Sequence, residues 1–350
     1  PEEGAHRLLD DEKAYTRLGA GVHATGELSQ ESMDATVEAL RRMIGIAEEF
    51  GADQMRAVAT AAMRRATNAP AFLERLKADL GLNVEIISQI EEGRLAFLSA
   101  AGAFDLEGRA AVMDIGGGSV EIVRSTGHEI EGLTSLPIGA VVLSERFHRE
   151  DPMPKGEYKR LRKHARSVLR HALGSDPDPV VMLVGSGGTV NALAAIVASA
   201  GNPSYSTLQG FELRREELVH NLARLVRSSA DERRQTPGLP ENRVDIIVAG
   251  AVVVSEVMRA LGANALWVNT KGVREGIVID TIDRTRGTER QLDRAEAIRA
   301  FGRRCSYDAE HAEQVCALSL SLFDQLQDQL ALDSDTRPLL EAAALLHDVG

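Results

Sequence analysis

Predicted strands and helices alternate regularly between residues 54 and 115, and this order constrains the fold more than any other feature of the chain. Three short apolar runs have the character of strands, and the two segments between them have helical spacing: 54–60, 84–88 and 110–115, then 70–80 and 91–101. Strands that alternate with helices form parallel sheets, because each helix carries the chain back to the start of the next strand. We therefore predict an α/β fold, preceded by an amphipathic helix at 28–50 with Ser29 or Ser32 as its cap.

After residue 118 the pattern changes to short alternating runs separated by turn residues, which predicts an antiparallel meander. These runs are Val120–Arg124, His128–Leu133 and Ser135–Ile138. A further set of elements then repeats the plan of the first block: a helix at 155–173, a strand at 180–184 and a helix ending at 200. A polar region follows, and after it come an apolar segment, a short buried strand and a closing helix: 201–240, 243–254, 266–268 and 273–282.

The chain is long enough for more than one hydrophobic core, since its 350 residues exceed the ~100–150 typical of a domain. Two α/β blocks and a helical region predict three parts, which we place at 1–108, 109–285 and 286–350. The chain begins with Pro1 and stops at Gly350 within what reads as a motif. We therefore expect it to be a piece of a longer protein.

Composition excludes several classes of protein. The net charge of −12 argues against general nucleic-acid binding, which normally needs a basic surface. The longest apolar stretch, Ile246–Val254, is far shorter than the ~20 residues that cross a bilayer, so we expect no membrane span and, by default, a cytoplasmic protein. Cys305 and Cys316 are too few for a disulfide scaffold or a four-cysteine zinc site.

A glycine-rich loop at the end of a predicted strand carries the clearest chemical signal. Asp114 ends the strand, and Gly116, Gly117, Gly118 and Ser119 follow it. Glycine amides can approach phosphate oxygens closely and together form an anion-binding concavity. A second turn of this kind spans Gly185 to Thr189, directly between a predicted strand and a helix, and its candidate phosphate contacts are Gly187, Gly188 and Thr189. The alternative, a glycine-rich turn with an incidental acid, explains one such loop but not two.

The hairpin that follows the loop should bring Glu121 back beside Asp114. Two neighbouring carboxylates are suitable ligands for a hard divalent cation such as Mg²⁺, directly or through water. The glycines would then bind phosphate and the carboxylates would bind the metal ion.

Ligands of parallel α/β sheets bind at the C-terminal ends of the strands, so we expect a cleft where these ends meet. Hydrolysis of a phosphate ester or anhydride also needs a base, and Glu91 and Glu92 begin a helix across this cleft from the glycine loop. The alternative is that acids in a first helical turn only interact with the helix dipole. Arg64 follows a strand and is suited to bidentate contact with phosphate, although it could equally be a solvated charge beside Arg65.

The helix at 155–173 carries a stripe of cations at spacings of three and four residues. Its members are Lys155, Lys159, Arg160, Arg162, Lys163, Arg166 and Arg170. Such a stripe is usually a solvated face. In an otherwise acidic chain it is also suited to guide a long polyanion.

The helical tail places one histidine on a first helix, which Asp308 can cap, and a His-Asp pair at the end of a second. These residues, His311, His347 and Asp348, resemble the HD metal-binding pattern, in which imidazole and carboxylate groups ligate divalent ions. Three ligands are one fewer than that pattern uses. A buried structural role is the alternative.

Five segments taken together resemble the exopolyphosphatase and guanosine pentaphosphate phosphohydrolase family. They are Ala59–Arg64, Glu91–Arg94, Asp114–Ser119 with Glu121, Gly187–Thr189 and Gly272–Gly276. Their order and spacing are more specific than any single glycine turn, and the resemblance covers most of residues 10–283. It implies two actin-like (ribonuclease H-like) α/β domains around a cleft, and longer members of the family add an HD-like helical domain.

The resemblance also implies an activity and a role for each matched residue. The activity is Mg²⁺-dependent removal of the terminal phosphate from inorganic polyphosphate or of the 5′ γ-phosphate from guanosine pentaphosphate. Glu92 would be the general base and Arg64 a phosphate clamp, with Asp114 and Glu121 on the metal side and Arg243 as a further phosphate contact. Another divalent metal, or an additional monovalent cation such as K⁺, is compatible with this chemistry. A homodimer follows by analogy only.

The family's first phosphate loop, Asp-x-Gly-Ser-Asn-Ser, lies upstream of the residues present here. If the protein lacks this loop, a non-catalytic protein that senses polyphosphate or guanosine pentaphosphate is an alternative to a hydrolase of either compound. A sugar kinase or chaperone ATPase can share the fold, but no motif for phosphate transfer to an acceptor is evident.

Overall fold

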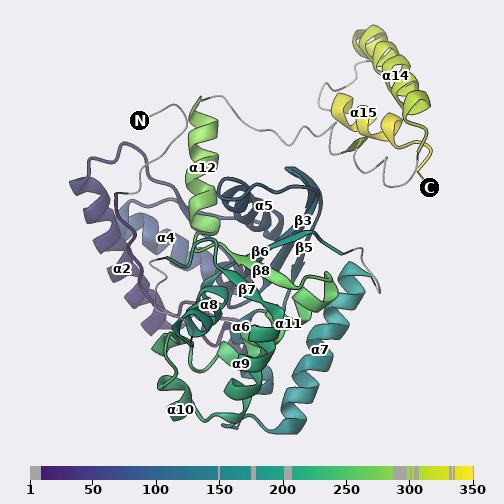
Figure 1. Cartoon of the computed structure of the whole chain (residues 1–350). Helices are drawn as coiled ribbons and strands as arrows, with labels where there is room; N and C mark the ends of the chain where they lie inside the picture. Colours follow the sequence, from purple (N-terminus) through teal and green to yellow (C-terminus); the bar gives the residue numbers. More distant parts are fainter. Residues whose placement is uncertain are drawn as a thin grey trace.

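The computed structural model describes residues 9–148, 150–174, 179–200, 207–286, 298–299, 302, 307–330, 333 and 336–349. It is an α/β protein with two sheets and a separate helical tail (Figure 1). The first part of the chain contains α1 (Val22–Thr25), α2 (Gln30–Glu49), β1 (Ala57–Ala59), α3 (Ala61–Arg65), α4 (Ala69–Leu80), β2 (Val84–Ile86) and α5 (Gln89–Ala101).

The second part contains most of the remaining strands and helices. They are β3 (Arg109–Ile115), β4 (Val120–Thr126), β5 (Glu129–Leu136), α6 (Ala140–Phe147), α7 (Lys155–Leu173), β6 (Met182–Ser186), α8 (Gly188–Ala200), β7 (Glu212–Arg214), α9 (Arg215–Arg227), α10 (Ala230–Arg234), the 3₁₀ helix η1 (Glu241–Arg243), α11 (Ile247–Ala260), β8 (Ala265–Val268) and α12 (Val273–Arg286).

The larger sheet has six strands in the order β5-β4-β3-β6-β8-β7. The three central strands β3, β6 and β8 are parallel, and antiparallel strands complete both sides. The predicted meander is therefore confirmed. Parallel pairing is confirmed in both sheets, but the predicted strand at 110–115 lies in the larger sheet as β3 and not beside β1 and β2. The smaller sheet is the parallel pair β1 and β2, whose helices pack around Phe72, Leu76 and Met63.

Residues of β3 alternate between two hydrophobic cores, as the two-residue period of a strand requires. Met113 and Ile115 belong to the large core beneath α7, α8, α9 and α11. Ala110 and Val112 face the opposite core, which contains Phe97 of α5. Because helices cover both faces, β3 is almost completely buried, and the loop that follows it is held on a rigid strand.

Helix α12 returns to the first part of the chain and packs on α5 (Figure 1). A Cβ atom at Gly276 would lie 1.9 Å from the carbonyl oxygen of Leu95, so the two backbones touch at this point. No larger residue fits at 276 without separating the helices.

Two predicted boundaries in the larger sheet are wrong. His128–Leu133 and Ser135–Ile138 are not separate strands, because Thr134 pairs with Ile122 and keeps β5 continuous to Leu136. The predicted turn at Gly185 is also displaced: β6 runs on to Ser186, and α8 begins at Gly188, so Gly187 alone forms the turn. The short helices α3, α6 and α10 were not predicted, since each is eight residues or fewer.

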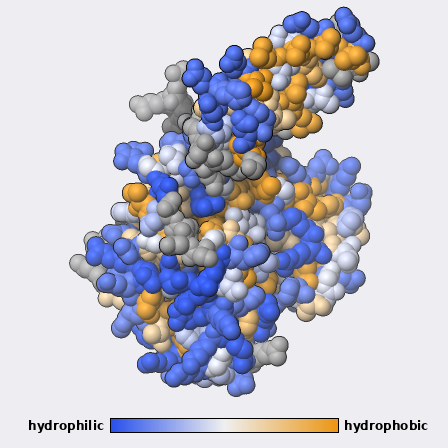
Figure 2. All heavy atoms as spheres, turned by 90° about the vertical axis from the view of Figure 1, so that its right-hand side faces the viewer, coloured by the Kyte–Doolittle hydropathy of each residue, from blue (hydrophilic) through white to orange (hydrophobic). Residues whose placement is uncertain are grey.

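The tail contains α14 (Ala309–Leu330) and α15 (Arg337–Leu345), which pack through Cys316, Ala344 and Leu345. Asp308 accepts a hydrogen bond from the amide of His311 at 3.1 Å, which confirms the predicted cap. Figure 2 shows hydrophobic surface over these helices, where the exposed leucines of α14 lie: Leu318, Leu322, Leu326 and Leu330. Cys305 lies outside the described residues.

Within the residues that the structure describes, no helix is both long and apolar enough to cross a membrane. The predicted domain boundaries at 108 and 285 stay predictions. The smaller sheet lies before the first boundary, the larger sheet lies between the two boundaries, and the α14–α15 pair lies after the second.

Candidate functional site

A cavity of about 780 Å³ opens between the two sheets and brings together residues from distant parts of the chain. Its walls include the start of α3, the first turn of α5, the glycine loop after β3 and the start of α6. Among the predicted site residues, Glu92, Gly116, Gly117, Gly118, Ser119 and Arg243 line it. A volume in this range suits a small-molecule ligand.

The glycine loop is held against the N-terminus of α6. The carbonyl oxygens of Gly116 and Gly117 accept hydrogen bonds from the amides of Ala140 and Val141, each at 3.0 Å. A Cβ at Gly139 would lie 2.3 Å from the carbonyl oxygen of Gly117, so this close approach needs glycine. Within the described chain, the amides of Gly117 and Gly118 donate to no backbone oxygen, which leaves them available for an anion.

Two buried carboxylates lie beneath the loop on neighbouring strands. Asp114 and Glu121 are direct partners in the antiparallel register of β3 and β4. The hydroxyl of Ser186 donates to Oδ1 of Asp114 at 2.5 Å, and that of Ser135 donates to Oε1 of Glu121 at 2.7 Å. Oε2 of Glu121 is buried and has no hydrogen-bond partner among the described residues.

Burial disfavours the ionised form of both carboxylates. It raises the pKa of Asp114, and the charge of Glu92 adds to the rise against the hydrogen bond from Ser186. Burial likewise raises the pKa of Glu121 to about 7, with a further contribution from Glu92. A divalent cation would stabilise both carboxylates in their charged form. The unpartnered Oε2 and the neighbouring Asp114 therefore fit the donor set that Mg²⁺ requires.

Glu92 stands in the first turn of α5 and is only 8% exposed. Ser88 caps this helix by accepting from the amide of Glu91 at 3.1 Å. Arg64 donates one guanidinium nitrogen to Oε2 of Glu92 at 2.7 Å and another to the carbonyl oxygen of Ile87 at 2.8 Å. Arg64 thus lies behind Glu92, and its neighbour Arg65 lines the cavity.

The second glycine turn supports a cation. Gly187 has φ +97°, and a Cβ there would lie 2.4 Å from the carbonyl oxygen of Ile115. A Cβ at Gly188 would lie 2.1 Å from Nη2 of Arg243, so the guanidinium rests directly on the backbone where α8 begins. Burial lowers the pKa of Arg243.

The predicted residues therefore form two layers. Glu92, the 116–119 loop and Arg243 line the cavity. Asp114, Glu121 and the 187–189 turn lie outside the lining, beneath those residues. The cavity residues before α2, which include Tyr15, Arg17 and His23, were not predicted, because no motif marks them. Ser186 was also missed as a partner of Asp114, although its place at the end of a parallel strand was a usable signal.

The cationic stripe on α7 is more than a solvated face. Arg162 and Arg166 donate to Glu256 of α11 at 3.0 Å, and Arg259 donates to the same carboxylate at 2.8 Å. Glu256 is 1% exposed, so these arginines hold α7 on the core. Their role in guiding a polyanion stays a prediction.

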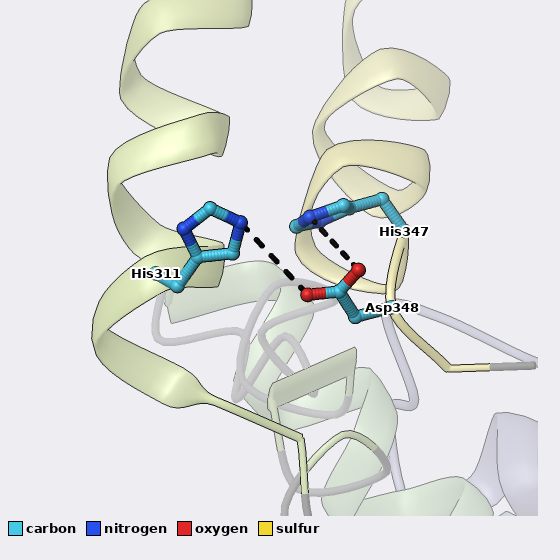
Figure 3. A group of neighbouring side chains, drawn as sticks. All are labelled: His311, His347 and Asp348. Atoms are coloured by element: carbon cyan, nitrogen blue, oxygen red, sulfur yellow. Dashed lines mark ion pairs between the residues drawn. The ribbon is translucent and has the colours of Figure 1, made fainter.

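The three tail residues do lie together (Figure 3). His311 points from α14 toward His347 and Asp348, which follow α15, and their potential ligand atoms lie within 4.8 Å of one another. Nε2 of His347 is 3.3 Å from Oδ1 of Asp348, and Nε2 of His311 is 3.8 Å from Oδ2. All three residues are substantially exposed, which contradicts the alternative of a buried structural role.

Comparisons with known proteins agree on one family. The model of the Ppx/GppA phosphatase family matches residues 2–285. A crystal structure of the Aquifex aeolicus Ppx/GppA family member is 32% identical, with 77% of this chain and 87% of that chain covered and a TM-score of 0.66. An exopolyphosphatase from Cytophaga hutchinsonii is 27% identical, with coverages of 79% and 90% and a TM-score of 0.74.

Proposed function

The chain belongs to the Ppx/GppA phosphatase family, and from this premise we propose that it hydrolyses the terminal phosphate of inorganic polyphosphate. Its fold is the expected one, with two actin-like α/β domains followed by a helical segment. Phosphatase chemistry follows from the family. The substrate, the metal ion and the residue roles are our proposals.

The observation that carries the proposal is that Glu92 and the Gly116–Ser119 loop line one cavity. A terminal phosphate held by the free amides of Gly117 and Gly118 would present its phosphorus atom to that cavity. Glu92 is a buried carboxylate in that lining and is suited to orient and deprotonate the attacking water. Arg243, which lines the same cavity, is suited to bind a phosphate oxygen.

Asp114 and Glu121 are proposed to hold Mg²⁺, because their donor atoms and the unpartnered Oε2 fit a hard cation. When bound, the ion would neutralise charge on the phosphate oxygens. Ser186 and Ser135 orient the two carboxylates through their hydrogen bonds. Arg64 binds Oε2 of Glu92 and so orients the proposed base.

The direct test is Glu92→Gln with polyphosphate and Mg²⁺. We expect phosphate release to fall by several orders of magnitude while the melting temperature is retained, since the amide keeps the size of the side chain but accepts no proton. The exposed Glu107→Gln is the matched control and should retain full activity. Wild-type rates in Glu92→Gln would remove this residue from the mechanism.

Guanosine pentaphosphate is the second candidate substrate. The cavity volume and the side chains of Tyr15 and His23 along its wall favour a ligand with a base as well as phosphates. Turnover of both substrates should be measured side by side with one preparation. Binding of either anion without phosphate release would instead support the non-catalytic sensor.

For the tail we propose a divalent metal site at His311, His347 and Asp348. Nδ1 of His347 lies 2.9 Å from the carbonyl oxygen of Ala344, which can only accept, so this nitrogen carries the proton and Nε2 is free to ligate. Imidazole and carboxylate ligands suit Zn²⁺, Mn²⁺ or Co²⁺. Calorimetry with Zn²⁺ should lose one binding event in His347→Ala but not in the exposed His171→Ala.

A homodimer is also proposed, by analogy with the family alone. Light scattering over a range of protein concentrations tests it. A constant monomer mass would rule it out.

A further inference from the structure

We propose that Asp280 of α12 is a positioning residue that holds the first turn of α5, and therefore Glu92, in place through Arg94. This inference rests on the proposed role of Glu92 as the base. Asp280 touches neither the cavity nor Glu92, and it would act only through the chain of contacts described below.

Asp280 is buried at 5% exposure and binds arginines from three elements. Its Oδ1 accepts from Nη2 of Arg94 at 2.5 Å. Its Oδ2 accepts from Arg56, which precedes β1, at 2.5 Å, and lies 2.9 Å from Nε of Arg284. One carboxylate thus joins α12, α5 and the segment that leads into the smaller sheet.

Arg94 transmits this connection to the start of α5. Its Nε and Nη2 bind the two carboxylate oxygens of Glu91 at 2.8 and 2.7 Å, in a bidentate pair. Glu91 directly precedes Glu92 in the first turn. First turns lack the full set of intrahelical hydrogen bonds and fray readily, so a tether at Glu91 limits the movement of its neighbour.

The packing of α12 makes it a firm support for this tether. Gly276, whose position allows the backbone contact with Leu95, lies four residues before Asp280 and so on the same face of α12. The helices can therefore neither slide nor separate at this point without a clash or a broken ion pair. Asp280 is held one turn from the closest contact between the two backbones.

The charges of this group balance internally. Asp280, Glu91 and Glu85 face Arg56, Arg94 and Arg284. Although burial raises the pKa of Asp280, the hydrogen bonds from Arg94 and Arg56 outweigh it, and the net shift is downward. The carboxylate is therefore ionised at neutral pH. With no charge in excess, the group is suited to hold helices together rather than to bind an ion.

The test is Asp280→Asn, which keeps the shape of the side chain and removes its charge. Displacement of a catalytic group by about 1 Å can cost on the order of 10²-fold in rate, so we expect kcat to fall by roughly that factor with KM little changed. Arg94→Lys should behave alike, because lysine cannot bind Glu91 and Asp280 in the same geometry. Asp34→Asn, which breaks an exposed contact with Arg75, is the matched control.

The same substitution in a Glu92→Gln background separates positioning from a general loss of structure. If Asp280 acts by placing Glu92, Asp280→Asn should have no further effect on the residual rate of Glu92→Gln. An equal loss in both backgrounds, or unchanged kcat in folded Asp280→Asn, would overturn the inference. Wild-type activity of Glu92→Gln itself would instead overturn the proposed function on which the inference rests.

Discussion

Arg64 donates to Oε2 of Glu92 at 2.7 Å, so the proposed base is in an ion pair when no substrate is present. The pair is sheltered, since both side chains are mostly buried. Arg64 also binds the carbonyl oxygen of Ile87, directly after β2, which fixes the guanidinium between the end of β2 and the first turn of α5. This arrangement orients Glu92 toward the cavity without placing Arg64 in the cavity wall.

Removal of this guanidinium should therefore affect the rate more than substrate binding. We expect Arg64→Ala to lower kcat by roughly 10²-fold, because Glu92 loses the partner that orients it. Arg64→Lys should recover only part of the rate, since a lysine cannot bind Glu92 and Ile87 as a fork. Steady-state kinetics with polyphosphate provide the measurement. A change in KM alone would instead identify Arg64 as a direct substrate contact.

Glu121 should make the metal-free protein less stable as pH rises. Its pKa of about 7 in the folded state exceeds the ordinary glutamate value of 4.5, so between these values the unfolded chain releases a proton that the folded chain retains. Stability is lost as pH rises from 4.5 to 7, by about 3 kcal/mol from this group. Denaturation in a chelator should show that loss in the wild type relative to Glu121→Gln. An equal dependence of stability on pH in the wild type and Glu121→Gln would contradict the raised pKa of Glu121.

Metal binding should also depend on the protonation of Glu121, but the affinity should increase as pH rises. A divalent ion at Asp114 and Glu121 must displace the proton that Glu121 holds below pH 7. The apparent affinity for Mg²⁺ should therefore rise about tenfold per pH unit below 7 and level off above it. Calorimetry between pH 5.5 and 8.5 measures this. Glu121→Gln should bind weakly at every pH.

Two adjacent glycines should respond differently to alanine. Gly187→Ala forces a Cβ to within 2.4 Å of a backbone oxygen at φ +97°, and should destabilise the fold by about 2 kcal/mol. Gly188→Ala meets only the end of Arg243, which can move away, so the fold should survive.

Displacement of Arg243 should nevertheless weaken phosphate binding. We expect Gly188→Ala and Arg243→Ala each to raise KM roughly tenfold, because a hydrogen bond to a charged group is worth about 1.5 kcal/mol. The double variant should be no worse than either single one. Additive effects on KM would show that Gly188→Ala does not act through Arg243.

The fold was predictable where local pattern decides structure. Helix α2 with its Ser29 cap and the antiparallel meander after β3 follow from periodicity and turn residues. The extent of β5 was not predictable, because it depends on pairing with β4 rather than on its own residues. Gly185 reads locally as a turn, yet parallel pairing with Met113 keeps it in β6.

The candidate site shows the same division. Loop residues adjacent in sequence, such as Gly116–Ser119, could be identified from the chain alone. Contacts over long separations could not be, and these include Arg64 with Glu92 and Arg94 with Asp280. Such pairs depend on how two helices meet, which no local pattern encodes.

The pairing of Asp114 with Glu121 across the hairpin also limits how this chain can change in length. Side chains alternate between faces along a strand, so a slip of one residue in β4 would turn Glu121 away from Asp114. A single insertion or deletion between them would therefore separate the two carboxylates of the proposed metal site, although both residues are retained. Natural variants of this hairpin should differ by substitution far more readily than by gain or loss of a residue.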